Sequence, residues 1–274
     1  MIPPTRRLSY RSFDLRLEGD LTEDEARSLI DAALARPGDR VAFVEPRENG
    51  TPDPDGKPER FFVKAEFRRP HQSLRARFKP GRAVSEGRGY RRALEAGIPA
   101  PQIMMFGEQP RWFPRSCAIV VTHKLRGLDA ARRYVRKGEL EIPLAAADLL
   151  ARVHASGFVH GDAALRNFLS SGGVMHVIDL PRWGPWSQRN AELDLSRLIT
   201  STHKRLALPA EGEELLDAYE ASDCGAAQQL APAWRERVRE EGARYRAHLD
   251  ERDATRPERH ARKSKQLRPG QRRP

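Results

Sequence analysis

The stretch FVHGDAALRNFLSSGGVMHVID, residues 158–179, contains the residues that decide which fold this chain adopts. Its second half has two short apolar runs around a Ser-Gly-Gly turn, which is the pattern of a tight β-hairpin. The hairpin is expected to deliver Asp179 at the end of its second strand. The first half is expected to be a loop that carries His160, Asp162 and Asn167. Four polar side chains are therefore predicted to lie in one region.

The types and order of these side chains suit the transfer of a phosphoryl group. A carboxylate is needed near the attacking hydroxyl, and an amide and a second carboxylate can hold Mg²⁺ on the phosphates of the donor. A cation is also needed on the α- and β-phosphates, and Lys64 in the strand-like run 60–67 can supply it. A carboxylate on the helix expected over 82–96 should hold this lysine, and we favour Glu86 over its rival Glu95.

With Lys64 ahead of the polar residues of 158–179, the sequence resembles the protein-kinase-like superfamily. Aminoglycoside and choline phosphotransferases and RIO-type protein kinases share this skeleton. The phrases EAGIPAP at 95–101 and IDLPR at 178–182 look most like the bacterial lipopolysaccharide core kinases, the Kdo/heptose kinase family. The resemblance covers about residues 40–205. Its other matching stretches are FVK at 62–64, VVTHKL at 120–125 and ELDLSRL at 192–198.

The resemblance implies an α+β, protein-kinase-like bilobal fold with a small strand-rich N-lobe and a helical C-lobe. It also implies an ATP- and Mg²⁺-dependent kinase whose acceptor is a sugar hydroxyl, on Kdo or heptose, in the core of lipopolysaccharide. Arg166 would neutralise charge on the γ-phosphate or fix the acceptor. By position, the catalytic residues would be Asp162 and Arg166, the nucleotide-binding residues Lys64, Glu86, Asn167 and Asp179, and the Mg²⁺ ligands Asn167 and Asp179.

The sequence departs from the usual kinase pattern in two places. No Gly-x-Gly-x-x-Gly loop precedes Lys64, so the turn-rich stretch 46–58 would have to cover the phosphates instead. The metal-binding motif reads Asp179-Leu180-Pro181 rather than Asp-Phe-Gly, and no Ala-Pro-Glu follows it. An activation loop switched by phosphorylation is therefore not expected.

Four residues near these motifs are expected to support the structure. In kinase-like folds the histidine at the position of His160 more often braces the catalytic loop through hydrogen bonds than touches substrate. Asp194, on the helix that follows, is expected to anchor the same loop. Trp183 and Trp186 could stack on a sugar face, but such tryptophans more often pack, and we favour packing.

The chain is expected to divide into four segments. A capping box at Thr22 and Glu25, followed by apolar residues at helical spacing, predicts a helix near the N-terminus. We therefore expect a helical extension ahead of the kinase-like part. The segments are 1–36 for this extension, 37–125 for the N-lobe with the interlobe hinge at its end, 126–250 for the C-lobe with the catalytic loop, and 251–274 for a basic, disordered tail.

Hydrophobic patterns predict the main elements of the lobes. Strands are expected at 41–44, 60–67, 103–106 and 117–121. Helices are expected at 82–96, 128–135, 143–155, 191–203, 211–222 and 232–250.

The composition of the 274 residues, 39% hydrophobic and 32% charged, is typical of a globular protein. No apolar run approaches the roughly 18 residues of a membrane-spanning helix, and the N-terminus lacks the apolar stretch of a signal peptide, so a cytoplasmic location is expected. Cys117 and Cys224 lie far apart without ligand spacing, which predicts free thiols and neither a disulfide nor a zinc site.

Positive charge is concentrated at the C-terminus. The formal net charge is +11, and residues 251–274 alone hold nine Lys/Arg against three Asp/Glu. This excess predicts either a solubilising extension or a mobile arm that contacts phosphate-rich partners. A lipid-linked sugar at the inner membrane surface is such a partner, and the tail would then make peripheral contact with the membrane. No stable nucleic-acid partner is expected.

Two other functions stay open. An atypical, RIO-like protein Ser/Thr kinase would use the same residues but would phosphorylate a polypeptide. A non-catalytic, kinase-shaped protein would instead bind nucleic acid through its basic arm, with salt-dependent affinity and no release of ADP. The complete set of Lys64, Asp162, Asn167 and Asp179 argues against the non-catalytic alternative.

Overall fold

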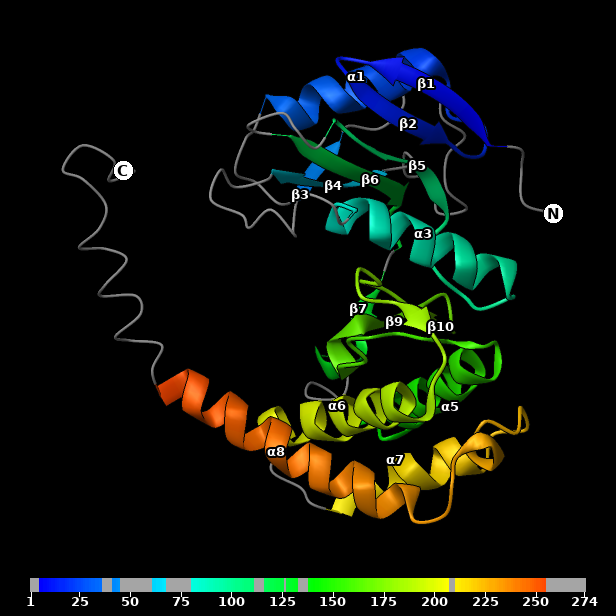
Figure 1. The fold of residues 1–274 in the computed structure, drawn as a ribbon, viewed down its shortest axis with the longest axis vertical. Coiled ribbons are helices and arrows are strands. Elements are labelled where there is room, and N and C mark those ends of the chain that lie inside the picture. The colour runs from blue at the N-terminus through cyan, green and yellow to red at the C-terminus, as the bar shows by residue number, and fades with distance from the viewer. Residues whose placement is uncertain are drawn as a thin grey trace.

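The fold has two lobes, one above the other in Figure 1. The upper, smaller lobe is built on one antiparallel sheet, and the lower lobe is mainly helical. This arrangement confirms the expected α+β, bilobal fold. It is seen in a computed structural model that describes residues 5–35, 41–44, 61–67, 80–110, 116–125, 127–132, 138–206 and 210–254.

Antiparallel strands in the order β1-β2-β5-β6-β4-β3 make the sheet of the small lobe. β4 and β6 pair along their whole lengths, with Lys64 opposite Val120. Because side chains alternate along a strand, Lys64 and its neighbour Val63 lie on opposite faces of the sheet. The strands are β1 (Arg6–Tyr10), β2 (Phe13–Leu17), β3 (Val41–Val44), β4 (Phe61–Phe67), β5 (Ile103–Glu108) and β6 (Cys117–His123).

Two helices cover the two faces of this sheet (Figure 1). Helix α1 (Glu23–Leu34) packs its apolar side on one face. Its capping box is present as predicted: the Thr22 hydroxyl accepts a hydrogen bond from the Glu25 amide, and the Glu25 carboxylate accepts one from the Thr22 amide. Helix α3 (Arg82–Glu95) covers the opposite face, from which Lys64 projects.

The N-terminal segment is not the helical extension that the sequence predicts for 1–36. β1 and β2 form a hairpin that joins the sheet at β5, and Leu15 and Leu17 are fully buried in the same apolar cluster as α1. The hairpin turns at Arg11 and Ser12, whose φ angles are 46° and 65°. Such turns usually hold Asn-Gly, and without that signal the hairpin was not recognisable in the sequence.

Helices make up most of the large lobe, and short strands lie between them (Figure 1). β9 pairs with β10 and β7, and β11 pairs with β8. The helices are α5 (Glu141–Ala155), η1 (Leu165–Asn167), α6 (Gln188–Leu206), α7 (Ala210–Glu220), η2 (Ala227–Gln229) and α8 (Trp234–Ala254). The strands are β7 (Leu128–Asp129), β8 (Phe158–Val159), β9 (Phe168–Ser171), β10 (Val174–Val177) and β11 (Gly184–Pro185).

The β9–β10 hairpin confirms the prediction made from the Ser-Gly-Gly motif. Ser171 pairs with Val174 across the turn. The turn residues Gly172 and Gly173 have φ angles of 57° and 77°, which glycine adopts without steric cost. The second strand leads directly to Asp179, as expected from the sequence.

One expected helix is wrong at its start. The sequence predicts a helix over 128–135, but Leu128 and Asp129 form β7 instead. Residues 133–137 and the phosphate-covering stretch expected at 46–58 lie outside the described residues. The lobe boundaries expected at 37, 125 and 250 remain predictions.

The expected disordered tail, 251–274, is wrong for its first four residues. Residues 251–254 belong to α8, and residues 255–274 lie outside the described part of the chain. Within the described ranges, no helix is both long and apolar enough to cross a bilayer. Cys117 and Cys224 are both free thiols, as predicted.

A second apolar cluster runs through both lobes. It contains Tyr90 of α3, Phe106 and Val120 of the sheet, and Leu150 and Leu180 of the large lobe, all at most 4% exposed. Helix α3 therefore shares its core with the large lobe and is held between the two lobes rather than on the outside of one.

The buried side of β2 allows a direct test of this architecture. Leu15→Ala should lower the free energy of unfolding by about 2–5 kcal/mol, because it leaves a cavity in the small-lobe core. Asp14→Ala, on the exposed side of the same strand, is the matched control and should change it by less than about 0.5 kcal/mol. Urea unfolding followed by circular dichroism measures both values. Equal costs for the two variants would contradict a hairpin that is part of the core.

Candidate active site

Three predicted site residues meet between the lobes. Nζ of Lys64, on β4, lies 2.5 Å from Oε2 of Glu86, on α3, and 2.7 Å from Oδ1 of Asp179, which follows β10. The Glu86 side chain is 2% exposed, whereas those of Lys64 and Asp179 are 25% and 35% exposed. The ammonium group thus joins a buried carboxylate to one that solvent can reach.

Burial and charge act against each other in this group. Burial lowers the pKa of Lys64, but the charges of Glu86 and Asp179 raise it more, so the ammonium form is favoured. Burial raises the pKa of Asp179, yet Lys64 more than offsets this, and the net pKa lies below its ordinary value. Burial also raises the pKa of Glu86, and Lys64 offsets this only in part. Of the two carboxylates, it is therefore the more accessible one, on Asp179, whose ionised form is favoured.

Tyr90, which was not among the residues predicted from the sequence, completes this group. Its hydroxyl donates to Oε1 of Glu86 at 2.9 Å and accepts from the Asp179 amide at 2.9 Å. Burial, together with the charge of Glu86, raises the pKa of Tyr90 well above its ordinary value, so the hydroxyl keeps its proton. The available signal was helical spacing, since Tyr90 lies four residues after Glu86 on the same face of α3.

Asp162, Arg166 and Asn167 meet on the catalytic loop, which is the name used here for residues 160–167. Nη2 of Arg166 lies 3.4 Å from Oδ2 of Asp162, and their side chains are 52% and 18% exposed. Nδ2 of Asn167 donates to the Asp162 carbonyl at 2.7 Å. This last bond leaves the Asn167 amide oxygen for a ligand.

His160 joins the catalytic loop to the strand before Asp179. Its Nε2 donates to the Ile178 carbonyl at 3.1 Å, and its Nδ1 accepts from the Asp162 amide at 3.3 Å. These partners require the neutral Nε2–H tautomer, and burial lowers the pKa of His160 accordingly. The Ile178 amide in turn donates to the Asn167 carbonyl at 2.9 Å. These contacts favour the expected bracing role.

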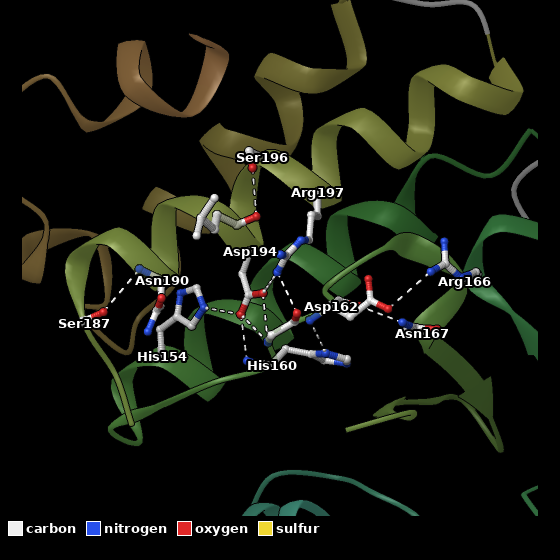
Figure 2. A network of polar contacts seen from close by, with 12 residues as sticks. His154, His160, Asp162, Arg166, Asn167, Ser187, Asn190, Asp194, Ser196 and Arg197 are labelled. Atoms are coloured by element: carbon white, nitrogen blue, oxygen red, sulfur yellow. Dashed lines mark hydrogen bonds and ion pairs between the residues drawn. The ribbon is translucent and has the colours of Figure 1, made fainter. Parts of the chain in front are cut away.

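Asp194, from α6, is the buried anchor of the catalytic loop (Figure 2). Its carboxylate accepts from the His160 amide at 2.7 Å and from the Gly161 amide at 3.0 Å. Arg197 donates to the Gly161 carbonyl at 2.7 Å. Burial raises the pKa of Asp194, but the hydrogen bond and charge of His154 lower it more, so the carboxylate stays ionised.

His154 and Tyr219 extend this network and were not anticipated as a pair. Nε2 of His154 lies 3.5 Å from Oδ2 of Asp194, and its Nδ1 lies 2.8 Å from the Tyr219 hydroxyl (Figure 2 shows His154). Both histidine and tyrosine are fully buried. The sequence places them 65 residues apart on α5 and α7, so only the packing of these helices brings them together.

Asn167 and Asp179 fit a hard cation such as Mg²⁺, because both offer oxygen atoms. Among the described residues, no group of three or more His, Cys, Asp or Glu side chains could hold a metal by itself. Mg²⁺ is usually bound by one or two protein oxygens together with phosphates and water. These two residues therefore fit the metal when a nucleotide supplies the other ligands.

A pocket opens beside the ion group at the start of α3. Its lining includes Lys64, Asp179 and Arg82, a residue that the sequence analysis did not single out. The charge of Arg82 contributes to the lowered pKa of Asp179. Glu66, whose carboxylate accepts a hydrogen bond from the Arg82 amide at 2.8 Å, also lines the pocket. A pocket with two cations and two carboxylates suits a phosphate chain that carries a bound metal.

The remaining candidates have structural partners. Glu95 pairs with Arg91, four residues earlier on α3, and not with Lys64. Trp183 donates its indole N–H to the Ser85 carbonyl at 2.8 Å, and Trp186 packs against the core that runs through both lobes. The contacts of both tryptophans favour packing over sugar stacking.

Comparisons with known proteins agree with this fold. The sequence model of the Lipopolysaccharide kinase (Kdo/WaaP) family matches residues 49–219. WaaP in complex with acyl carrier protein is a similar solved structure, with 19% identity, 84% of this chain and 98% of that chain covered, and a TM-score of 0.55. An aminoglycoside-3′-phosphotransferase of type VIII has 18% identity and a TM-score of 0.46, and the match covers 78% of this chain and 98% of that chain. A search of curated proteins finds no significant match. At these identities the structural likeness shows the fold alone.

Two glycines with positive φ allow a test of how closely the catalytic loop is packed. A Cβ on Gly161 (φ 77°) would lie 2.6 Å from the Arg182 carbonyl carbon, whereas one on Gly157 (φ 82°) would meet nothing within 4 Å. Gly157→Ala should therefore cost only backbone strain, about 1–2 kcal/mol. Gly161→Ala should cost at least about 1 kcal/mol more, because the loop must move. Urea unfolding measures the difference, and equal losses would contradict the close packing.

Proposed function

The chain belongs to the lipopolysaccharide kinase (Kdo/WaaP) family and is a kinase that phosphorylates an alcohol group, and we propose that its acceptor is a sugar hydroxyl of the lipopolysaccharide core, on Kdo or heptose. The observation that carries this proposal is the meeting of Lys64, Glu86 and Asp179. Residues 22 and 115 positions away from the lysine converge on one ammonium group that borders a pocket. ATP is the proposed phosphate donor.

Lys64 is proposed to orient the α- and β-phosphates of ATP. Glu86 holds the lysine side chain against the sheet, which reduces the freedom that the side chain would lose on binding phosphate. Arg82, which lines the same pocket, adds a second positive charge beside the phosphates. The pocket would thus attract and align the donor.

Asp162 is proposed to orient the acceptor hydroxyl and to accept its proton as the γ-phosphoryl group moves in line. The neighbouring hydrogen bond from Asn167 to its carbonyl holds the Asp162 backbone in place. Arg166, beside the Asp162 carboxylate and half exposed, is proposed to neutralise charge on the γ-phosphate or to fix the acceptor. Asn167 and Asp179 would hold Mg²⁺, which neutralises charge on the phosphates when bound.

The acceptor is proposed to be lipid-linked and to lie at the inner surface of the membrane. Residues 255–274, outside the described residues, hold eight Lys/Arg against one Glu. Such a segment is attracted to anionic headgroups and phosphorylated sugars, by about 1 kcal/mol per basic residue near the surface. We therefore propose peripheral membrane contact through the tail.

Asp179→Ala tests the proposed site. Loss of its carboxylate should lower phosphate transfer at least about a hundredfold, because the charge that develops on the phosphates loses its support. Purified protein is incubated with γ-labelled ATP, Mg²⁺ and a bacterial membrane extract, and lipid-linked glycan is separated from protein. Asp14→Ala, an exposed aspartate on β2, is the matched control and should transfer like the wild type.

The location of the label decides between the candidate functions. Label in the glycolipid that disappears with Asp179→Ala supports the proposed sugar kinase. Label in protein alone would favour the RIO-like protein kinase. Transfer by Asp179→Ala at the wild-type rate would contradict the proposed role of Asp179.

Removal of residues 255–274 tests the proposed role of the tail. The truncated protein should show a higher KM for membrane-borne acceptor, most clearly at low salt, where charges are least screened. Its kcat on a soluble sugar acceptor should not change, since the described lobes are intact. Steady-state kinetics at two salt concentrations measure both constants. An unchanged KM on membranes would make the tail a solubilising extension.

A further inference from the structure

We propose that Tyr90 is a positioning residue that sets the metal-binding carboxylate of Asp179, and that it forms with Trp183 a docking lock between α3 and the loop after β10. The docking lock is defined as two hydrogen bonds, from the Asp179 amide to the Tyr90 hydroxyl and from the Trp183 indole to the Ser85 carbonyl. The proposed use of Asp179 as a metal ligand rests on the proposed function; the lock itself rests on these contacts.

The first step is a closed ring of hydrogen bonds. The Asp179 amide donates to Tyr90, Tyr90 donates to Glu86, and the other Glu86 oxygen accepts from Lys64, which reaches the Asp179 carboxylate. The ring holds Asp179 by its backbone on one side and by its side chain on the other. Each hydrogen bond in the ring orients the groups that form the next one. Loss of the Tyr90 hydroxyl would remove its bonds to the Asp179 amide and to Glu86, and Asp179 would then be held by its side chain alone.

The second step concerns the backbone of Asp179. Its φ is 58°, in the left-handed region that residues other than glycine rarely adopt. A left-handed residue persists only where its surroundings impose it. The amide of Asp179 donates a hydrogen bond to the Tyr90 hydroxyl. This hydrogen bond stabilises the left-handed conformation of Asp179. In another conformation the carboxylate would leave its place beside Lys64.

The third step is the second half of the lock. The turn of α3 that carries Gly89 lies so close to the loop that a Cβ there would be 2.7 Å from Cδ1 of Trp183 and 2.8 Å from Cβ of Leu180. The Trp183 indole reaches the Ser85 carbonyl one helical turn earlier. Two contacts along α3 resist rotation as well as displacement of the helix.

The docked position of α3 is therefore part of the core and not the product of a switch. Tyr90 and Leu180 belong to one buried cluster with the large lobe. The sequence after Asp179 lacks the Ala-Pro-Glu of kinases whose activation loop is switched by phosphorylation. Tyr90 and Trp183 would thus keep the metal-binding carboxylate in place permanently.

Tyr90→Phe tests the proposal, because it removes the hydroxyl and keeps the ring in the core. Binding of Mn²⁺ in the presence of ADP is followed by electron paramagnetic resonance of free Mn²⁺. The variant should bind Mn²⁺ about tenfold more weakly, and its kcat should fall about tenfold with the KM for acceptor unchanged. Tyr10→Phe, which removes a phenol hydrogen bond to Asp31 far from the site, should alter neither by more than about twofold.

A residue that only packs would give a different result. Circular dichroism confirms that each variant is folded before binding is measured. If folded Tyr90→Phe binds Mn²⁺ and turns over like the wild type, the proposal is overturned. If Tyr90→Phe does not fold, Trp183→Phe, which loses only the indole hydrogen bond and part of the ring, takes its place. It should weaken Mn²⁺ binding by about threefold or more, and a wild-type affinity would overturn the lock.

The binding measurement separates this proposal from the proposed function. If the wild type labels no glycolipid but binds ADP and Mn²⁺, the proposed acceptor is wrong and the comparison of Tyr90→Phe with Tyr10→Phe still decides the role of Tyr90. If the wild type binds no Mn²⁺ with ADP, both proposals fail.

Discussion

The ammonium group of Lys64 is the interaction on which the site depends, because it joins three parts of the chain that lie far apart in the sequence. The lysine comes from the small-lobe sheet, Glu86 from α3, and Asp179 from the loop that follows the large-lobe hairpin. Two ionised, partly dehydrated carboxylates repel each other, and the ammonium group between them offsets this repulsion. The ion group therefore forms only when the sheet, the helix and the large lobe are all in place, which makes the site a product of the whole fold.

Asp194 has the corresponding role within the large lobe. The catalytic loop turns through a left-handed Gly161, and the amides of His160 and Gly161 point at the Asp194 carboxylate. The buried Asp194 carboxylate satisfies those amides, the His154 ring lies beside it, and the guanidinium of Arg197 offsets its charge. A fully bonded polar network of this kind is rigid, and such rigidity supports the proposed role of Asp162 in aligning the acceptor.

Local patterns were sufficient for much of the site. The Gly-Gly turn predicted the hairpin that leads to Asp179, and the expected preference of Lys64 for Glu86 over Glu95 agrees with the structure. The turn at Arg11 and Ser12 was not predictable, because residues without a preference for left-handed backbone occupy it. Tyr90 was visible as a neighbour of Glu86 on one helix face, but its second partner is a backbone amide, and side-chain identities carry no information about where that amide lies.

The sequence by itself determined the chemistry of this protein: which carboxylates, amide and lysine are present, in which order, and on which kinds of element. Those choices are local, since strand alternation, helix period and turn residues act over a few positions. Only the tertiary structure decided that the N-terminal hairpin completes the sheet, that His154 and Tyr219 support Asp194, and that Tyr90 and Trp183 hold α3 against the loop after β10. Each of these depends on contacts between segments dozens of residues apart, and such contacts form only when burial of apolar surface brings the segments together.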